Sequence, residues 1–307
     1  MLYLHQVNCF VPEDFLTIEE AGHLYGLSPA EVRVYKRIYG IEKIPRANMP
    51  LKEMLMRSLK ALLEQSAIDT NLIRYCIYCH TAKVVVPFGE PILQTLCDQA
   101  GLKNVIAFGT STNNCASPLV SLDLLDHILD RNEWGIILCG DLAITSVLQV
   151  IPNTSLLGEA SSAILVSQQV AKDQLLAIST QTMGRYAAGL WLTPEDAKHF
   201  EQSYPVLLAQ TICDAIRKAH LSLDQIRIII PHNINLPSWQ RVAKELKISL
   251  NKIWLSNVKQ YSHCFGADIF INFVSIEAEK LIQPGDYWIM ATVGLGATFS
   301  AAVFIRN

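Results

Sequence analysis

The sequence predicts an α/β protein built from two similar halves. Segments with the apolar spacing of helices alternate along the chain with runs of β-branched and other apolar residues that are typical of buried strands. In addition, residues 119–142 align without a gap with residues 273–296, so that Trp134 falls on Trp288 at an offset of 154 (288 − 134). The alternation and the repeat together indicate a duplicated βαβ unit.

Both halves follow the same order of elements. In the first half we expect helices over 50–67, 90–102 and 116–132, and strands over 73–82, 104–110, 133–143 and 158–169. In the second half we expect helices over 204–221, 237–248 and 268–282, strands over 226–235, 287–294 and 297–307, and an extended segment over 252–261. The predicted domains are therefore an N-terminal half, 1–168, and a C-terminal half, 169–307.

Composition excludes several functional classes. Half of the 307 residues are apolar and 17% are charged, and Lys+Arg 25 against Asp+Glu 28 gives a net charge of −3. This balance argues against a nucleic-acid-binding surface and gives no support to a polybasic membrane anchor. The uncharged run Tyr287–Ile305 has nearly the length of a membrane helix, but Gly294 and Gly296 interrupt it. We expect two buried strands around a glycine turn instead.

The cysteines indicate a reducing compartment. Eight of them are scattered through apolar segments, and the N-terminus has no signal-peptide pattern, so we expect a cytoplasmic protein. The segment Cys76–His80 matches a haem-attachment pattern, but a strand there would point Cys76 and Cys79 to opposite faces, and we expect no haem. No metal or nucleotide fingerprint is present, so we expect neither a metal nor a cofactor.

Cys115 is the first candidate for chemistry. It stands between a predicted strand and a predicted helix, after the short polar segment 111–114. Unpaired N–H groups and the positive end of a helix dipole stabilise a thiolate at such a place. From position alone, an ordinary buried cysteine is an equally good interpretation.

Two histidines and an aspartate are the second set of candidates. His232 follows the apolar strand 226–230, and His263 comes 31 residues later (263 − 232) in the segment that leads to Asp268. Because pre-helix loops of the two copies would meet about a pseudo-twofold axis, Cys115 and His263 are expected at one centre. Asp268 either orients an imidazole or is a simple N-terminal helix charge.

Further candidates are weaker. Gly294 and Gly296 can bring backbone N–H groups to a reacting carbonyl, although a β-turn alone would also require them. His199 is an outside candidate for substrate binding.

The constellation resembles the β-ketoacyl-acyl carrier protein synthase III group of thiolase-fold condensing enzymes. The resemblance rests on Cys115 at a helix start, on Pro231–Asn235 (PHNIN), and on segments similar to the family around Arg37, at 156–166 and at 293–305. It covers nearly the whole chain. It implies a five-layered αβαβα sandwich and a homodimer. It also implies an acyl-coenzyme A or acyl-carrier-protein substrate, with Arg37 and Asn235 as substrate-binding residues.

The departures from the family suggest which reaction is catalysed. His263 stands at or next to the position where ordinary members carry an asparagine, and Leu236-Pro237 replaces a basic residue that often contacts coenzyme A. This resembles the divergent acyltransferase and starter-unit subgroup, and it favours a carrier-protein-bound acyl group. Since a histidine can remove a proton from an alcohol or amine, we expect an acyltransferase of secondary metabolism. A decarboxylative 3-oxoacyl synthase and a non-catalytic partner subunit are the alternatives.

Overall fold

A nine-stranded sheet is the framework of the structure, a computed structural model that describes residues 1–83, 85–87 and 89–307. The strands are β1 Tyr3–Phe10, β2 Phe15–Thr17, β3 Lys43–Pro45, β4 Ile73–Cys79, β5 Ile106–Thr110, β6 Trp134–Asp141, β7 Val150–Ile151, β8 Ser155–Leu156, β9 Ala160–Ser167, β10 Asp173–Thr182, β11 Ile226–Pro231, β12 Tyr287–Gly294 and β13 Thr298–Arg306. The α-helices are α1 Ile18–Leu24, α2 Pro29–Arg37, α3 Leu51–Ser66, α4 Ile92–Gln99, α5 Ser117–Ile128, α6 Ser146–Gln149, α7 Pro194–Lys218, α8 Leu236–Leu246, α9 Val258–Tyr261 and α10 Asp268–Ala278.

The sheet repeats one pairing pattern twice. Its order is β11-β12-β13-β10-β1-β9-β6-β4-β5. In one group β6 pairs parallel with β4 and antiparallel with β9, which pairs antiparallel with β1. In the other group β12 pairs parallel with β11 and antiparallel with β13, which pairs antiparallel with β10. The groups join where β1 pairs with β10, and the exact domain boundary at residue 168 stays a prediction.

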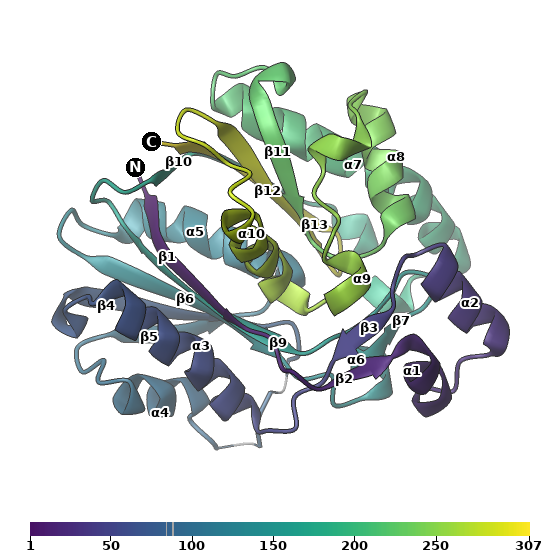
Figure 1. Cartoon of the computed structure of the whole chain (residues 1–307), viewed down its shortest axis with the longest axis horizontal. Coiled ribbons are helices and arrows are strands. Elements are labelled where there is room, and N and C mark those ends of the chain that lie inside the picture. The colour runs from purple at the N-terminus through teal and green to yellow at the C-terminus, as the bar shows by residue number, and fades with distance from the viewer. Residues whose placement is uncertain (84, 88) are drawn as a thin grey trace.

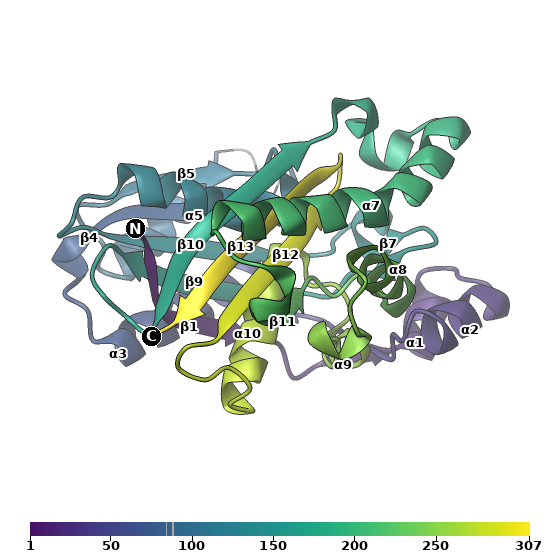
Figure 2. The same ribbon diagram turned by 90° about the horizontal axis from the view of Figure 1, so that it is seen from above.

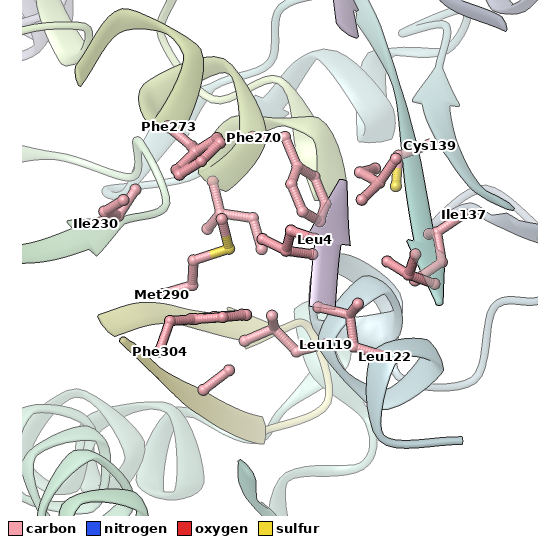
Figure 3. Close-up of a cluster of buried hydrophobic side chains, with 14 of the residues drawn as sticks. Leu4, Leu119, Leu122, Ile137, Cys139, Ile230, Phe270, Phe273, Met290 and Phe304 are labelled. Atoms are coloured by element: carbon pink, nitrogen blue, oxygen red, sulfur yellow. The ribbon is translucent and has the colours of Figure 1, made fainter. Parts of the chain in front are cut away.

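Five layers of helix and sheet follow from this arrangement. Helices α5 and α10 lie between the two groups of strands, and their apolar residues share one core with both groups (Figures 1 and 2). Helices α3 and α4 cover the outer face of the β4–β6 group, and α7 and α8 cover the outer face of the β11–β13 group. Figure 3 shows Leu119 and Leu122 of α5 and Phe270 of α10 in the shared core. The predicted α/β sandwich is confirmed.

The uncharged run Tyr287–Ile305 and the segment Cys76–His80, which match a membrane helix and a haem-attachment pattern, both lie largely in strands as expected. Residues Tyr287–Gly294 and Thr298–Arg306 form the antiparallel pair β12 and β13. No helix within the described part of the chain is long and apolar enough to cross a membrane. Cys76 and Cys79 lie in strand β4 and belong to different cores on its two faces.

Two expectations about the second half are wrong. The segment 252–261 is not extended: after a single parallel bridge between Ile253 and Ile229, it turns into helix α9. The side chain of Asn257 holds this turn against α10 through hydrogen bonds to Asn272 and Ser275. Helix α7 begins at Pro194 rather than at residue 204, because Thr193 caps its first turn and Pro205 is accommodated inside the helix.

Candidate active site

Cys115 lies in the turn that leads into helix α5, next to strand β12 of the second half. Strand β5 ends at Thr110, and the 3₁₀ turn Asn114–Ala116 leads directly into α5. Asn114 has a left-handed backbone (φ 49°), which turns the chain sharply before the cysteine. The Cys115 carbonyl accepts a hydrogen bond from the Thr292 hydroxyl of β12 at 3.3 Å, so the thiol is fixed by both halves.

His263 is the nearest base to the Cys115 thiol. Its Nε2 lies 3.4 Å from the Cys115 sulfur, and its Nδ1 lies 2.5 Å from Oδ2 of Asp268. Burial alone would lower the pKa of His263, but the negative charges of Asp268 and Cys115 and hydrogen bonds to both raise the pKa to about 10. The three side chains therefore form a connected sulfur–imidazole–carboxylate series.

The carboxylate of Asp268 is held on every side. It is fully buried at the first position of α10, where the helix dipole favours a negative charge. Oδ1 accepts the Cys264 N–H and Oδ2 accepts the Asn233 N–H, each at 2.6 Å. The same Oδ2 also accepts a hydrogen bond from the Nδ1–H of His263. These bonds fix the His263 tautomer that presents Nε2 to the sulfur.

His232 lies behind this series. Its ring centroid is 5.8 Å from that of His263, and its Nε2 is hydrogen-bonded to the Tyr204 hydroxyl at 3.2 Å. Its Nδ1 has no partner among the described residues. Burial, and secondarily the charge of His263, lower the pKa of His232 to about 3. His232 is therefore a neutral imidazole at ordinary pH.

A cavity of about 410 Å³ opens onto Cys115 and His263. Its wall is mostly apolar and is contributed by both halves of the chain. The described residues that line it are Thr81, Ala82, Lys83, Asn114, Cys115, Val147, Leu148, Ile151, Leu157, Ala187, Ala188, Gly189, Leu190, Trp191, His263, Phe265, Leu295 and Gly296. His232 is not part of this wall. Trp191 stands at the rim with 78% of its surface exposed.

The two glycines of the last turn serve different purposes. Gly296 has a left-handed backbone (φ 85°) and lines the cavity, which suits a backbone contact with substrate. Gly294 is buried against the Cys115 loop, and a Cβ placed there would lie 1.9 Å from the carbonyl oxygen of Asn113. The oxyanion role of both glycines stays a prediction.

Gly294→Ala is expected to destabilise the protein by about 1–3 kcal/mol, because the backbone of the Cys115 loop must move to admit the methyl group. Urea unfolding followed by circular dichroism measures this. Gly184→Ala is the matched control, since nothing lies within 4 Å of its added Cβ. Equal stability of both variants would contradict the close packing at Gly294.

Three other predicted residues lie away from the cavity wall. Asn235 caps α8 through the Ser238 N–H and donates to the Thr154 carbonyl. Arg37 lies at the end of α2 beside a separate surface hollow. His199 is hydrogen-bonded to the Tyr186 hydroxyl. Their substrate-binding roles stay predictions, and these contacts are structural.

Sequence reasoning missed Thr81, Asp141 and Tyr204. Thr81 contacts the Cys115 sulfur at 3.6 Å, and Asp141 binds the backbone of Thr81. Thr81 follows strand β4 and Asp141 ends the parallel strand β6. Polar residues at the ends of neighbouring parallel strands were the signal that could have indicated them. Tyr204 gave no such signal, because only tertiary packing brings α7 to His232.

Solved structures of other proteins share the fold of this chain. ChlB3, whose description names an acyltransferase, matches 99% of this chain and 97% of its own at a TM-score of 0.87 and 15% identity. A 3-oxoacyl-[acyl-carrier-protein] synthase III from Aquifex aeolicus VF5 matches 100% of both chains at a TM-score of 0.83 and 17% identity. The fold is therefore that of the thiolase-like condensing enzymes.

Sequence comparison gives matches over part of the chain. Residues 216–305 match the family described as 3-Oxoacyl-[acyl-carrier-protein (ACP)] synthase III C terminal. The beta-ketoacyl-[acyl-carrier-protein] synthase III of Roseiflexus castenholzii is 31% identical over 96 residues, which are 31% of this chain and 29% of that protein's length. These matches support a ketoacyl synthase III-like family, in agreement with the resemblance seen in the sequence.

Proposed function

We propose that the protein is an acyltransferase that carries the acyl group on Cys115. The observation that carries this proposal is the series Cys115–His263–Asp268, in which a buried carboxylate orients the imidazole that contacts the sulfur. The mostly apolar cavity in front of the sulfur suits an acyl chain. The description of ChlB3, which shares the fold, agrees with this class of reaction.

The first half-reaction forms the acyl-enzyme. The Cys115 thiolate attacks the carbonyl carbon of an acyl thioester, and the bond from that carbon to the carrier's sulfur breaks. The departing thiolate takes the proton from Nε2 of His263, which leaves the imidazole neutral. Asp268 stabilises the imidazolium before this step and holds the ring in place after it.

The second half-reaction uses the neutral imidazole as a base. An acceptor hydroxyl or amine gives its proton to His263 Nε2 as its oxygen or nitrogen attacks the acyl-Cys115 carbonyl. The Cys115 thiolate then leaves, and the thiolate–imidazolium pair is restored. In the first half-reaction, acylation removes the thiolate charge that helps to raise the pKa of His263, so the ring readily gives its proton to the carrier's departing thiolate and is neutral when the acceptor arrives.

The surroundings of His232 favour acyl transfer over decarboxylative condensation. The Nε2 of His232 is already bonded to Tyr204, and the ring does not line the described cavity. In this arrangement His263 is the imidazole that can reach an incoming acceptor. A 3-oxoacyl synthase remains the second candidate function because the family includes such enzymes by name.

The donor is proposed to be an acyl group on a carrier protein or on coenzyme A, with no further cofactor. The homodimer also remains a proposal. Strand β5, which lies at the edge of the sheet and exposes 42% of Ile106, is available for pairing with a second copy.

Intact-mass analysis and carbon dioxide release test the proposed function together. We expect acyl thioesters to add one acyl group to the protein, and a hydroxyl or amine acceptor to remove it as an ester or amide. With a malonyl thioester as the acceptor, we expect no carbon dioxide above the background of the protein-free mixture. Release of carbon dioxide with a 3-oxoacyl product would contradict acyl transfer and support the synthase. A protein that never becomes acylated would support the non-catalytic partner subunit.

A further inference from the structure

The Cys115 sulfur has a second polar contact besides His263. The hydroxyl of Thr81 lies 3.6 Å from it, a distance at which an O–H group hydrogen-bonds to sulfur. When the His263 ring donates to the thiolate, it leaves room on the sulfur for a second donor. The Thr81 hydroxyl is placed to be that donor.

Asp141 fixes the place of Thr81. The Thr81 N–H lies 3.1 and 3.0 Å from the two carboxylate oxygens, and the Ala82 N–H lies 3.0 Å from Oδ1. Asp141 is 1% exposed and ends strand β6, whereas Thr81 comes two residues after the end of the neighbouring parallel strand β4. A buried carboxylate that accepts three contacts from two consecutive amides strongly restricts this segment.

We propose that Thr81 donates a hydrogen bond to the Cys115 thiolate and that Asp141 is the positioning residue that holds Thr81 there. The proposal rests on the proposed function in taking Cys115 as the nucleophile. Removing a hydrogen bond to a charged group lowers the population of the charged form. Loss of the Thr81 hydroxyl therefore shifts thiolate formation to higher pH.

Several charged or titratable groups surround the sulfur and its partners. Burial raises the pKa of Asp141 to about 7, against the lowering effect of the amides that it binds. The other groups near the sulfur or its partners are His263 and Asp268 from the α10 side, Lys83 from the cavity wall, Tyr204 from α7 and His232 from the end of β11. Substitution of Thr81 leaves all of these groups in place, so a change in pH profile reports the hydroxyl.

Thiol alkylation measures the effect independently of acyl transfer. Iodoacetamide forms a carbon–sulfur bond with the Cys115 thiolate and releases iodide, and peptide mass spectrometry follows this site alone. All variants carry Cys213→Ser, because Cys213 is an exposed free thiol on α7. Thr81→Val is expected to raise the pH of half-maximal labelling by about one unit, so that at pH values below the parent's midpoint it reacts about tenfold more slowly.

The controls separate the hydroxyl from packing. Thr81→Ser is expected to restore the parent profile. Thr110→Val removes a threonine hydroxyl from the buried sulfur of Cys79, a contact of the same kind, and is expected to keep the parent profile at Cys115. Asp141→Asn is expected to shift the labelling profile to higher pH, as Thr81→Val does. It provides the test if circular dichroism shows that Thr81→Val does not fold.

The outcomes distinguish this inference from the proposed function. An unchanged labelling profile in Thr81→Val, or in Asp141→Asn if that variant must replace it, overturns the hydrogen bond even where the parent is acylated. A shifted profile restored by Thr81→Ser supports the hydrogen bond even where the parent accepts no acyl group, and in that case only the acyltransferase proposal fails.

Discussion

Cys115→Ala is expected to abolish covalent acylation of the protein. The sulfur that forms the thioester is then missing, and loss of a catalytic nucleophile typically costs roughly 10⁴-fold or more in rate. Intact mass after incubation with a panel of acyl-coenzyme A and acyl-carrier-protein donors measures the adduct. The fold should persist, because the thiol is a small side chain at the cavity wall.

Cys213→Ser is the matched control for this result. Cys213 is an exposed free thiol outside the cavity, so its removal should leave the adduct unchanged. If Cys115→Ala still gains one acyl group while Cys213→Ser gains none, the nucleophile has been assigned to the wrong cysteine.

Asp268→Asn is expected to lower the acylation rate by about 10³–10⁴-fold. An amide cannot accept all the hydrogen bonds from His263, Cys264 and Asn233, and its NH₂ group favours the wrong tautomer of the ring. Single-turnover acylation measures the loss. Asp196→Asn is the control, because Asp196 also lies in the first turn of a helix but is not among the described residues that line the cavity.

The same variant should change the pH dependence of stability. The pKa of His263 is raised to about 10 in the folded protein, so its stabilising contribution is complete below about pH 6.5 and is lost as the pH rises towards 10. Melting temperatures measured between pH 6 and 10 should therefore fall in the parent and fall less in Asp268→Asn. Parallel curves for the two proteins would contradict the ion pair.

The sequence predicts the repeat and most of the strands, because the repeat is visible as a gapless alignment and the strands as apolar runs. The gapless alignment that pairs Trp134 with Trp288 corresponds to equivalent strands β6 and β12 in the structure. Segment 252–261 was predicted wrongly, because the hydrogen bonds of Asn257 to α10 outweigh the local preference for an extended chain. The predicted helix 204–221 starts ten residues later than α7, whose first turn is capped by the Thr193 side chain and which continues through Pro205.

The candidate site was predictable only in part, because part of it depends on tertiary contacts that leave no local pattern in the sequence. Cys115 lies in the turn before α5, Asp268 begins α10 and His263 lies in the segment before α10, and the repeat relates the two helix starts to one another. The distance of His232 from the cavity was not readable, since it depends on Tyr204 of α7, and the Asp141–Thr81 contact depends on the register of two neighbouring strands. These features arise from tertiary packing rather than from spacing along the chain.

The internal repeat has a consequence for how the two copies share the chemistry. Cys115 lies in the turn Asn114–Ala116 that leads into α5, whereas the equivalent turn before α10, Phe265–Ala267, has Gly266 at the same place and follows His263. Neither half carries both partners, so under the proposed function the first half supplies the attacking sulfur and the second half supplies the proton carrier. The proposed thiolate–imidazolium pair can form only while the two halves of the chain are packed together. The reactivity of the Cys115 thiol therefore reports whether the two halves of the chain are packed against each other.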